Sequence, residues 1–213
     1  MTRLTRLRFS VLVPAAALPL LLAACGSASP NYYTLASSAP HADAEVAVAS
    51  SPLVFAVGPV QMPDYVDRPQ IVTRQSDYQL ALAENDYWAA PLDDLVPRVL
   101  VEDLQRRLPG SRVVGFPQVA GPNFNYRVAV DIGRFDVDAN GIATIAARWQ
   151  IYAATAPRAV VVDDSLLQTR GDGSGHAAAV AALSNGLGEL GDRIAQALRA
   201  LPQPVVPPLA PAS

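Results

Sequence analysis

The side chains that most often carry chemistry are scarce in this chain of 213 residues. It contains a single cysteine, Cys25, and two histidines, His41 and His176. One cysteine cannot form an internal disulfide, a zinc site of four thiolates or a redox-active cysteine pair. The two histidines are too far apart in the sequence to supply the rest of a metal cluster. We therefore expect neither a metal nor a cofactor.

The glycine-rich stretch from Gly171 to His176 precedes a predicted helix and so resembles a phosphate-binding loop. A P-loop needs a lysine followed by serine or threonine, but all 16 basic residues of this chain are arginines. A dinucleotide-binding fold would need the glycines between a parallel strand and its helix. Ser174 also lacks the G-x-S-x-G setting of a serine nucleophile. We interpret the stretch as a loop in which Ser174 caps the helix.

Pairs of neighbouring carboxylates could suggest acid–base or cation chemistry, and there are three of them: Asp93 with Asp94, Glu102 with Asp103, and Asp163 with Asp164. Neighbouring residues on a helix or strand point in different directions, so no pair is preset to share a proton or a metal ion. We expect no catalytic residue and no enzyme activity. A net charge of −3 also argues against a nucleic-acid partner, which would require a concentrated basic surface.

The start of the chain has the plan of an export signal. Three arginines precede an uncharged stretch, residues 9–24, which is short for a membrane-spanning helix. Leu22 to Cys25 looks like a bacterial lipobox, which predicts cleavage between Ala24 and Cys25 and a lipid on the cysteine. Two or three acyl chains hold a protein firmly on a membrane. An ordinary signal peptide or a transmembrane anchor is the alternative.

The residues after the cysteine bear on which membrane is involved. Gly26 and Ser27 stand where many enterobacterial lipoproteins carry an aspartate that retains them at the inner membrane. By analogy, we expect the periplasmic face of the bacterial outer membrane.

Apolar periodicity predicts an α+β domain, in which a mixed, largely antiparallel sheet carries two long amphipathic helices on one face. The helices are expected over residues 93–108 and from Gly175 to about Leu201. The second contains Gly186, Gly188 and Gly191, which would let the sheet, or alternatively another subunit, approach closely. We divide the chain into a lipoprotein signal peptide (1–24), the lipidated cysteine with a flexible tether (25–52), the α+β domain (53–201) and a proline-rich tail (202–213).

The most distinctive stretch of the domain, Asn85 to Leu92, lies directly before the first helix. It contains Tyr87, Trp88, Pro91 and Leu92. Two large aromatic residues at a turn favour a plug in the core, with an exposed contact patch for a partner or a second subunit as the alternative.

In order and spacing, these motifs resemble the family of ABC-type transport auxiliary lipoproteins of the Pqi type. The matching features are the lipobox, Tyr32-Tyr33-Thr34-Leu35, Val57-Gly58-Pro59-Val60, Pro63-Asp64-Tyr65, Trp88-Ala89-Ala90-Pro91-Leu92, the strand around Val128 to Phe135 and the last helix after Gly175. They cover nearly the whole chain after the signal peptide.

The resemblance implies a non-enzymatic, periplasm-facing lipoprotein that supports membrane integrity. Such a subunit would dock an envelope-spanning lipid transport system, with an inner-membrane transporter component and an MCE-domain protein that forms a hydrophobic conduit. Homo-oligomerisation is expected too. The alternative is a periplasmic carrier that binds lipid itself, which requires an apolar cavity. A secretion-channel lipoprotein would need long alternating membrane strands, and the sequence shows no such pair.

Overall fold

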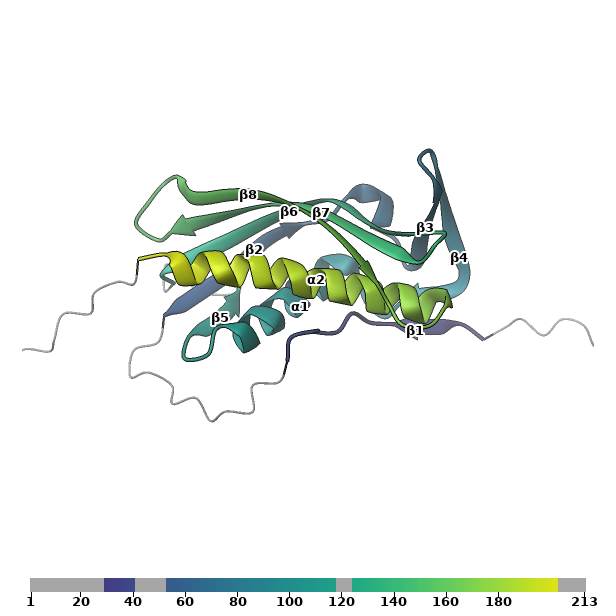
Figure 1. The fold of residues 1–213 in the computed structure, drawn as a ribbon, viewed down its shortest axis with the longest axis horizontal. Helices are drawn as coiled ribbons and strands as arrows, with labels where there is room; N and C mark the ends of the chain where they lie inside the picture. The colour runs from purple at the N-terminus through teal and green to yellow at the C-terminus, as the bar shows by residue number, and fades with distance from the viewer. Residues whose placement is uncertain (1–28, 41–52, 118–123, 203–213) are drawn as a thin grey trace, which may run out of the picture.

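The computed structural model describes residues 29–40, 53–117 and 124–202 (Figure 1). The predicted signal peptide, Cys25 with its cleavage site, and residues 203–213 of the predicted tail lie outside the described residues.

Two α-helices, one short 3-10 helix and eight strands make up the described chain. The helices are α1 (Leu92–Arg107), α2 (Gly175–Ala200) and the 3-10 helix η2 (Asp64–Val66). The strands are β1 (Asn31–Tyr33), β2 (Val54–Gln61), β3 (Gln70–Ser76), β4 (Gln79–Trp88), β5 (Arg112–Gly115), β6 (Tyr126–Asp138), β7 (Ile142–Ala153) and β8 (Ala159–Arg170). Both predicted long helices are confirmed, and Ser174 is the N-cap residue of α2, although its side chain makes no capping hydrogen bond.

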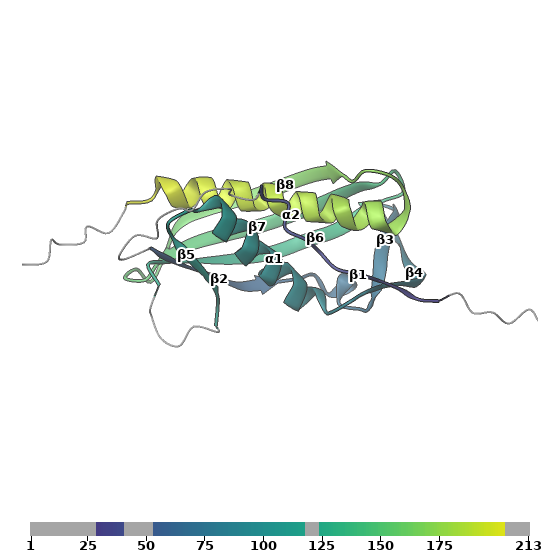
Figure 2. The same cartoon turned by 90° about the horizontal axis from the view of Figure 1, so that it is seen from below.

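All eight strands join one mixed sheet, and the two long helices cover one of its faces (Figures 1 and 2). β6, β7 and β8 form an antiparallel meander, and β3 with β4 forms an antiparallel hairpin. β2 pairs in parallel with β5 and β6, and β1 pairs in parallel with β4. α1 packs on β2 and β5, α2 packs on β7 and β8, and the helices contact each other. The predicted α+β fold class is confirmed.

Strand β6 organises the sheet because it pairs along both edges. One edge pairs with β7 over nearly its whole length. The other edge is shared: β2 pairs with its first half, from Tyr126 to Asp131, and β3 pairs with Val137 and Asp138 near its end. The chain leaves β2, turns through η2 and re-enters as β3. This fork places β3, β4 and β1 together at one end of the molecule, opposite the turn between β7 and β8 (Figure 1).

The core lies between the sheet and the two helices. Alternate residues of β6, among them Val128, Val130 and Ile132, point to the helices and are almost fully buried. The largest fully buried side chains include Trp149, Phe135, Leu100, Leu104, Leu187 and Leu190. Burial of a large apolar side chain contributes about 1.5–3 kcal/mol, so this layer is the main source of the domain's stability.

Neither long helix covers the opposite face of the sheet, where the short helix η2 lies near one end (Figure 1). One row across it consists of charged residues, Asp131, Arg148 and Asp164, which are neighbours on β6, β7 and β8. β8 is an edge strand whose only partner among the described strands is β7. Its exposed side chains are partly apolar: Val162 is 59% exposed and Leu166 is 65% exposed.

Residues 31–39 of the predicted flexible tether (25–52) pack on the predicted domain (53–201), whereas residues 25–28 and 41–52 lie outside the described residues. Residues 31–33 form β1, and residues 34–39 cross the outer side of the two helices (Figures 1 and 2). Leu35 and Ala39 are only 3% and 4% exposed, so this segment belongs to the domain. The segment has too few apolar residues to show a period, and polar contacts with distant residues hold it.

Candidate functional site

A segment that begins five residues after Cys25 is built into the fold. We call residues 30–39 the N-terminal strap. Its strand β1 pairs with Asp86, Tyr87 and Trp88 of β4. The carbonyl of Tyr33 accepts a hydrogen bond from the backbone N–H of Ala89 at 2.7 Å, which extends the pairing past the end of β4. The first described part of the chain is thereby fixed to one edge of the sheet.

A carboxylate on β4 holds the start of the strap. The Asn31 amide and the Tyr33 hydroxyl both donate hydrogen bonds to Asp86 Oδ1, at 3.0 and 2.8 Å. His176 Nδ1 lies 3.0 Å from Asp86 Oδ2. The hydrogen bonds from Tyr33 and Asn31 stabilise the charged form and lower the pKa of Asp86. The same contact raises the pKa of Tyr33, because deprotonation would lose the hydrogen bond and place two negative charges together.

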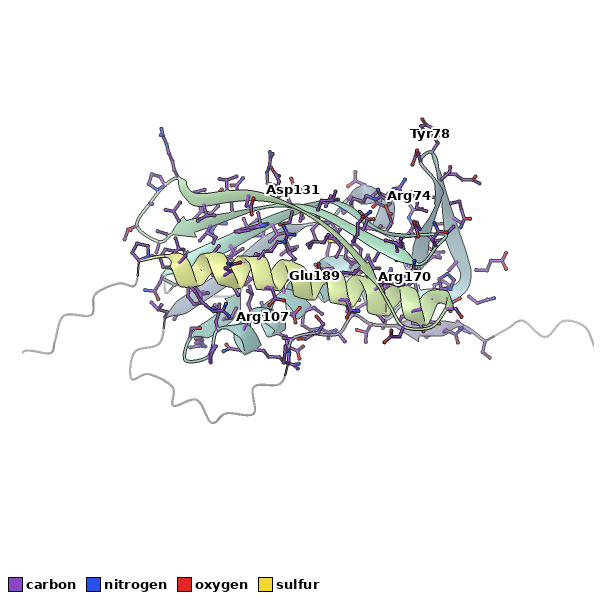
Figure 3. The ribbon with its side chains drawn as sticks, viewed as in Figure 1. Arg74, Tyr78, Arg107, Asp131, Arg170 and Glu189 are labelled. Carbon is purple, nitrogen blue, oxygen red and sulfur yellow. The ribbon has the colours of Figure 1, made fainter. Side chains whose placement is uncertain are left out.

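A second carboxylate, on α1, holds the end of the strap. Asp103 is fully buried, and its Oδ1 accepts hydrogen bonds from the Ser37 hydroxyl and from the backbone N–H of Ala39 at 3.1 Å. Arg107 Nη1 lies 3.0 Å from the same oxygen, and Arg107 also forms an ion pair with Asp192 of α2 (Figure 3). These contacts join the strap, α1 and α2 around one buried charge.

The glycines of α2 provide the surface on which these neighbours pack. A Cβ added at Gly186 would lie 2.9 Å from Ile145 of β7, and one at Gly191 would lie 3.3 Å from the Cβ of Asp103. A Cβ added at Gly188 would lie only 1.7 Å from the Ser38 hydroxyl of the strap. The helix α2 therefore packs closely on the sheet at Gly186, on α1 at Gly191 and on the strap at Gly188.

The stretch before α1 divides into buried and accessible residues. Trp88 and Leu92 are 6% and 5% exposed, so both belong to the core and neither is available to a partner in the folded chain. Pro91 is exposed, and Tyr87 is half-buried, with its hydroxyl donating to the carbonyl of Glu84 at 2.8 Å. Of the four residues considered for a contact surface, only Tyr87 and Pro91 can serve one.

A second buried carboxylate, which the sequence did not predict, lies on the side of β6 that faces away from the two long helices. Asp136 is fully buried and accepts hydrogen bonds from Tyr65 of η2, from Arg74 of β3 and from Arg134. Burial by itself would raise the pKa of Asp136, but the two arginines outweigh it and lower the pKa. Burial and the neighbouring carboxylate raise the pKa of Tyr65 to about 12. The cluster fastens η2 and β3 to the sheet, and Tyr65 and Arg74 lie 71 and 62 residues before Asp136 in the chain.

The glycine-rich loop considered for phosphate lines a pocket of about 310 Å³, together with Thr73, Asp138 and Arg170. The polar groups there are already engaged. Asp138 accepts hydrogen bonds from the backbone of Asn140 and Ile142, and Arg170 donates to the Asn140 carbonyl. These hydrogen bonds hold the loop in shape, and we continue to interpret the glycine-rich stretch as a connecting loop.

The side chains of one of the carboxylate pairs, Glu102 and Asp103, point in different directions, as expected. Glu102 pairs with Arg106 on the exposed side of α1, whereas Asp103 points into the core. Within residues 29–40, 53–117 and 124–202, no three histidine, cysteine or acidic side chains come together to hold a metal ion. In the same ranges no helix is long and apolar enough to cross a membrane.

Comparison with known proteins places the chain in a family. The model of the ABC-type transport auxiliary lipoprotein component matches residues 33–195, which include residues 33–39 of the strap, every strand after β1 and most of α2. The chain belongs to this family. It is 32% identical over 126 residues to the intermembrane transport lipoprotein PqiC of Escherichia coli K12, and equally to that of Shigella flexneri. The match covers 59% of this chain and 66% of the relatives' length.

Solved structures share the fold. A crystal structure of an uncharacterized protein superposes with a TM-score of 0.65 at 24% identity, covering 80% of this chain and 99% of that one. A protein of Xanthomonas campestris gives a TM-score of 0.60 at 19% identity, covering 77% and 92%. The family is one of transport auxiliary lipoproteins, which is not a class of enzyme.

Proposed function

We propose that this chain is a non-enzymatic lipoprotein on the periplasmic face of the outer membrane, where it docks an MCE-type lipid transport system that supports membrane integrity. The family match over residues 33–195 carries this proposal, because it begins eight residues after Cys25 and includes residues 33–39 of the strap. The name of the PqiC relatives supports transport between membranes as the process. The partners we propose are an MCE-domain protein and an inner-membrane transporter component.

The membrane attachment that we propose is a lipid on Cys25, added after cleavage behind Ala24. Metabolic labelling with a palmitate analogue tests it in cells that produce the full chain. We expect the wild type to be labelled and recovered with membranes, and the Cys25→Ala variant to be neither. Equal labelling of the two proteins would contradict the attachment.

The surface that we propose for contact between subunits is the exposed face of β8. An unpaired edge strand can pair with another chain, and clustered exposed apolar side chains often mark a contact site for another protein. Val160, Val162 and Leu166 are 47%, 59% and 65% exposed on this one strand. A homo-oligomer would cover them, and the unpaired backbone of β8 would be available to the neighbouring subunit.

Light scattering of the purified protein tests this surface. The Val162→Asp variant should shift the mass to the monomer without changing the far-ultraviolet circular dichroism spectrum. The matched control is Tyr78→Ser, which changes another exposed side chain, at the tip of the β3–β4 hairpin. An oligomer that survives Val162→Asp unchanged would contradict the assignment.

The shape of the domain favours docking over carriage of a lipid. The space between sheet and helices is filled by large side chains such as Trp149 and Phe135. The pocket of about 410 Å³ on the uncovered face is lined by Asp131, Arg148 and Asp164, and charged walls do not suit an acyl chain. Native mass spectrometry of the purified protein should therefore show no bound lipid beyond the one on Cys25.

A further inference from the structure

Very little chain separates the proposed attachment point from the folded domain. Asn31, the first residue of β1, comes six residues after Cys25. An extended chain spans at most about 3.5 Å per residue, so a lipid on Cys25 would keep the start of β1 within about 21 Å of the membrane. A tether that reached residue 52 would have allowed the domain to stand several times farther away.

The end of the molecule that carries β1 also presents aromatic side chains. Tyr32 is 68% exposed, and its ring centroid lies 6.0 Å from that of half-buried Tyr87 on β4. Tyrosine is enriched where membranes meet water, because its ring is apolar and its hydroxyl is polar. Tyr78, which is 98% exposed, lies at the tip of the β3–β4 hairpin at the same end (Figure 3).

The charges at this end indicate which headgroups it suits. Asp86 is already bonded to Asn31 and Tyr33, and the exposed charges nearby are mixed: Glu84, Asp93 and Asp94 are acidic, and Arg98 donates to the Thr34 hydroxyl of the strap. Carboxylates are repelled by a strongly anionic surface. The surface therefore fits zwitterionic phospholipid headgroups, such as phosphatidylethanolamine, better than anionic ones.

We propose that the edge formed by Tyr32 and Tyr87 rests in the headgroup region of the same membrane that holds Cys25. The domain is then seated directly on the bilayer, with β1 and β4 against the lipid and the β7–β8 turn, residues 154–158, pointing into the periplasm. Figures 1 and 2 show these two regions at opposite ends of the long axis. This inference rests on the proposed lipid attachment and adds an orientation to it.

Fluorescence quenching by lipids tests the orientation. The full-length lipidated protein is reconstituted into vesicles of phosphatidylethanolamine with a minor fraction of phosphatidylglycerol, and flotation confirms its attachment. Because the Cys25 thiol is consumed by the lipid, a cysteine introduced by Glu84→Cys beside the tyrosine pair, or by Thr155→Cys in the far turn, can be labelled alone. Headgroup nitroxide lipids should quench the label at position 84 at least about twofold more than the label at position 155.

A change in the aromatic pair separates contact from simple proximity. Adding Tyr32→Ser to the Glu84→Cys protein should reduce the quenching, whereas adding Val162→Ser on the uncovered face should not. Flotation with equal quenching at positions 84 and 155, or quenching unaffected by Tyr32→Ser, would overturn this inference and leave the lipid attachment standing. Loss of flotation would overturn both.

Discussion

The two ends of the sheet are held together in different ways. β6, β7 and β8 form long antiparallel pairs over a continuous apolar core, with polar pairs such as Arg148 and Asp164 left at the exposed surface. β3 and β4 at the other end, and the N-terminal strap that runs from there along the helices, are fastened by carboxylates with several donors each: Asp136, Asp86 and Asp103. The β6–β8 end is therefore held mainly by apolar burial, whereas polar contacts attach β3, β4 and the strap.

The largest effect should come from removing the carboxylate between η2, β3 and β6. The Asp136→Ala variant leaves Arg74 and Arg134 without their shared partner and should lower the free energy of unfolding by about 4 kcal/mol. Urea denaturation measures this change. The matched control is Asp164→Ala. It removes the carboxylate of a surface ion pair, in which the Arg148 side chain is 59% exposed and the Asp164 side chain is 66% exposed. It should cost less than about 1 kcal/mol, and equal losses in the two variants would contradict the comparison.

The strap should stabilise the folded domain, as residues of the core do. Leu35 is 3% exposed, so Leu35→Ala should lower the free energy of unfolding by about 3 kcal/mol. A free tether would give no change. Val162→Ala, on a side chain that is 59% exposed, is the control and should cost less than about 1 kcal/mol. A Leu35→Ala value within error of this control would show that the strap does not stabilise the domain.

A larger side chain on α2 beneath the strap should lower the free energy of unfolding by less. Gly188→Val places a branched side chain where Ser38 lies and should cost about 2 kcal/mol. It should also speed cleavage of the strap in limited proteolysis. Ala181→Val, on the exposed side of the same helix, should cost only about 0.5 kcal/mol and leave the cleavage rate unchanged. Identical cleavage of both variants would contradict a packed strap.

The smallest effect concerns alkaline pH. Tyr65 has its pKa raised from 10.0 to about 12 in the folded chain. A raised pKa stabilises the fold fully below the unfolded value, and this contribution is lost as the pH rises through the folded value. Stability should therefore fall between about pH 10 and 12, and Tyr65→Phe should flatten that fall. The Tyr78→Phe variant, whose hydroxyl is exposed, is expected to keep the wild-type profile.

The two ends also differ in how far the sequence predicts them. The apolar period of α2, from Val180 to Leu198, reports local geometry, so this helix was predicted with nearly correct bounds. Parallel pairing leaves no such local sign. The chain positions of β2 and β6 do not show that Phe55 lies beside Tyr126.

The polar end could not be predicted for a related reason. Ser37 and Asp103 are 66 residues apart, and Tyr65 and Asp136 are 71 apart, so no short motif joins them. Trp88 could be weighed as core or contact only by its residue type, and its burial follows from the tertiary fold. The glycines of α2 did indicate close packing, but the strap above Gly188 could not be foreseen from them.

The central claim is that this lipoprotein docks a transport conduit, and co-purification tests it most directly. The lipidated full chain is crosslinked in its own cell envelope and recovered under denaturing conditions, and the proteins bound to it are identified by mass spectrometry. We predict that an MCE-domain protein is recovered with the wild type and lost when the producing cells lack that protein's gene. Repeated recovery of the lipidated chain with no MCE-domain protein crosslinked to it would contradict the claim.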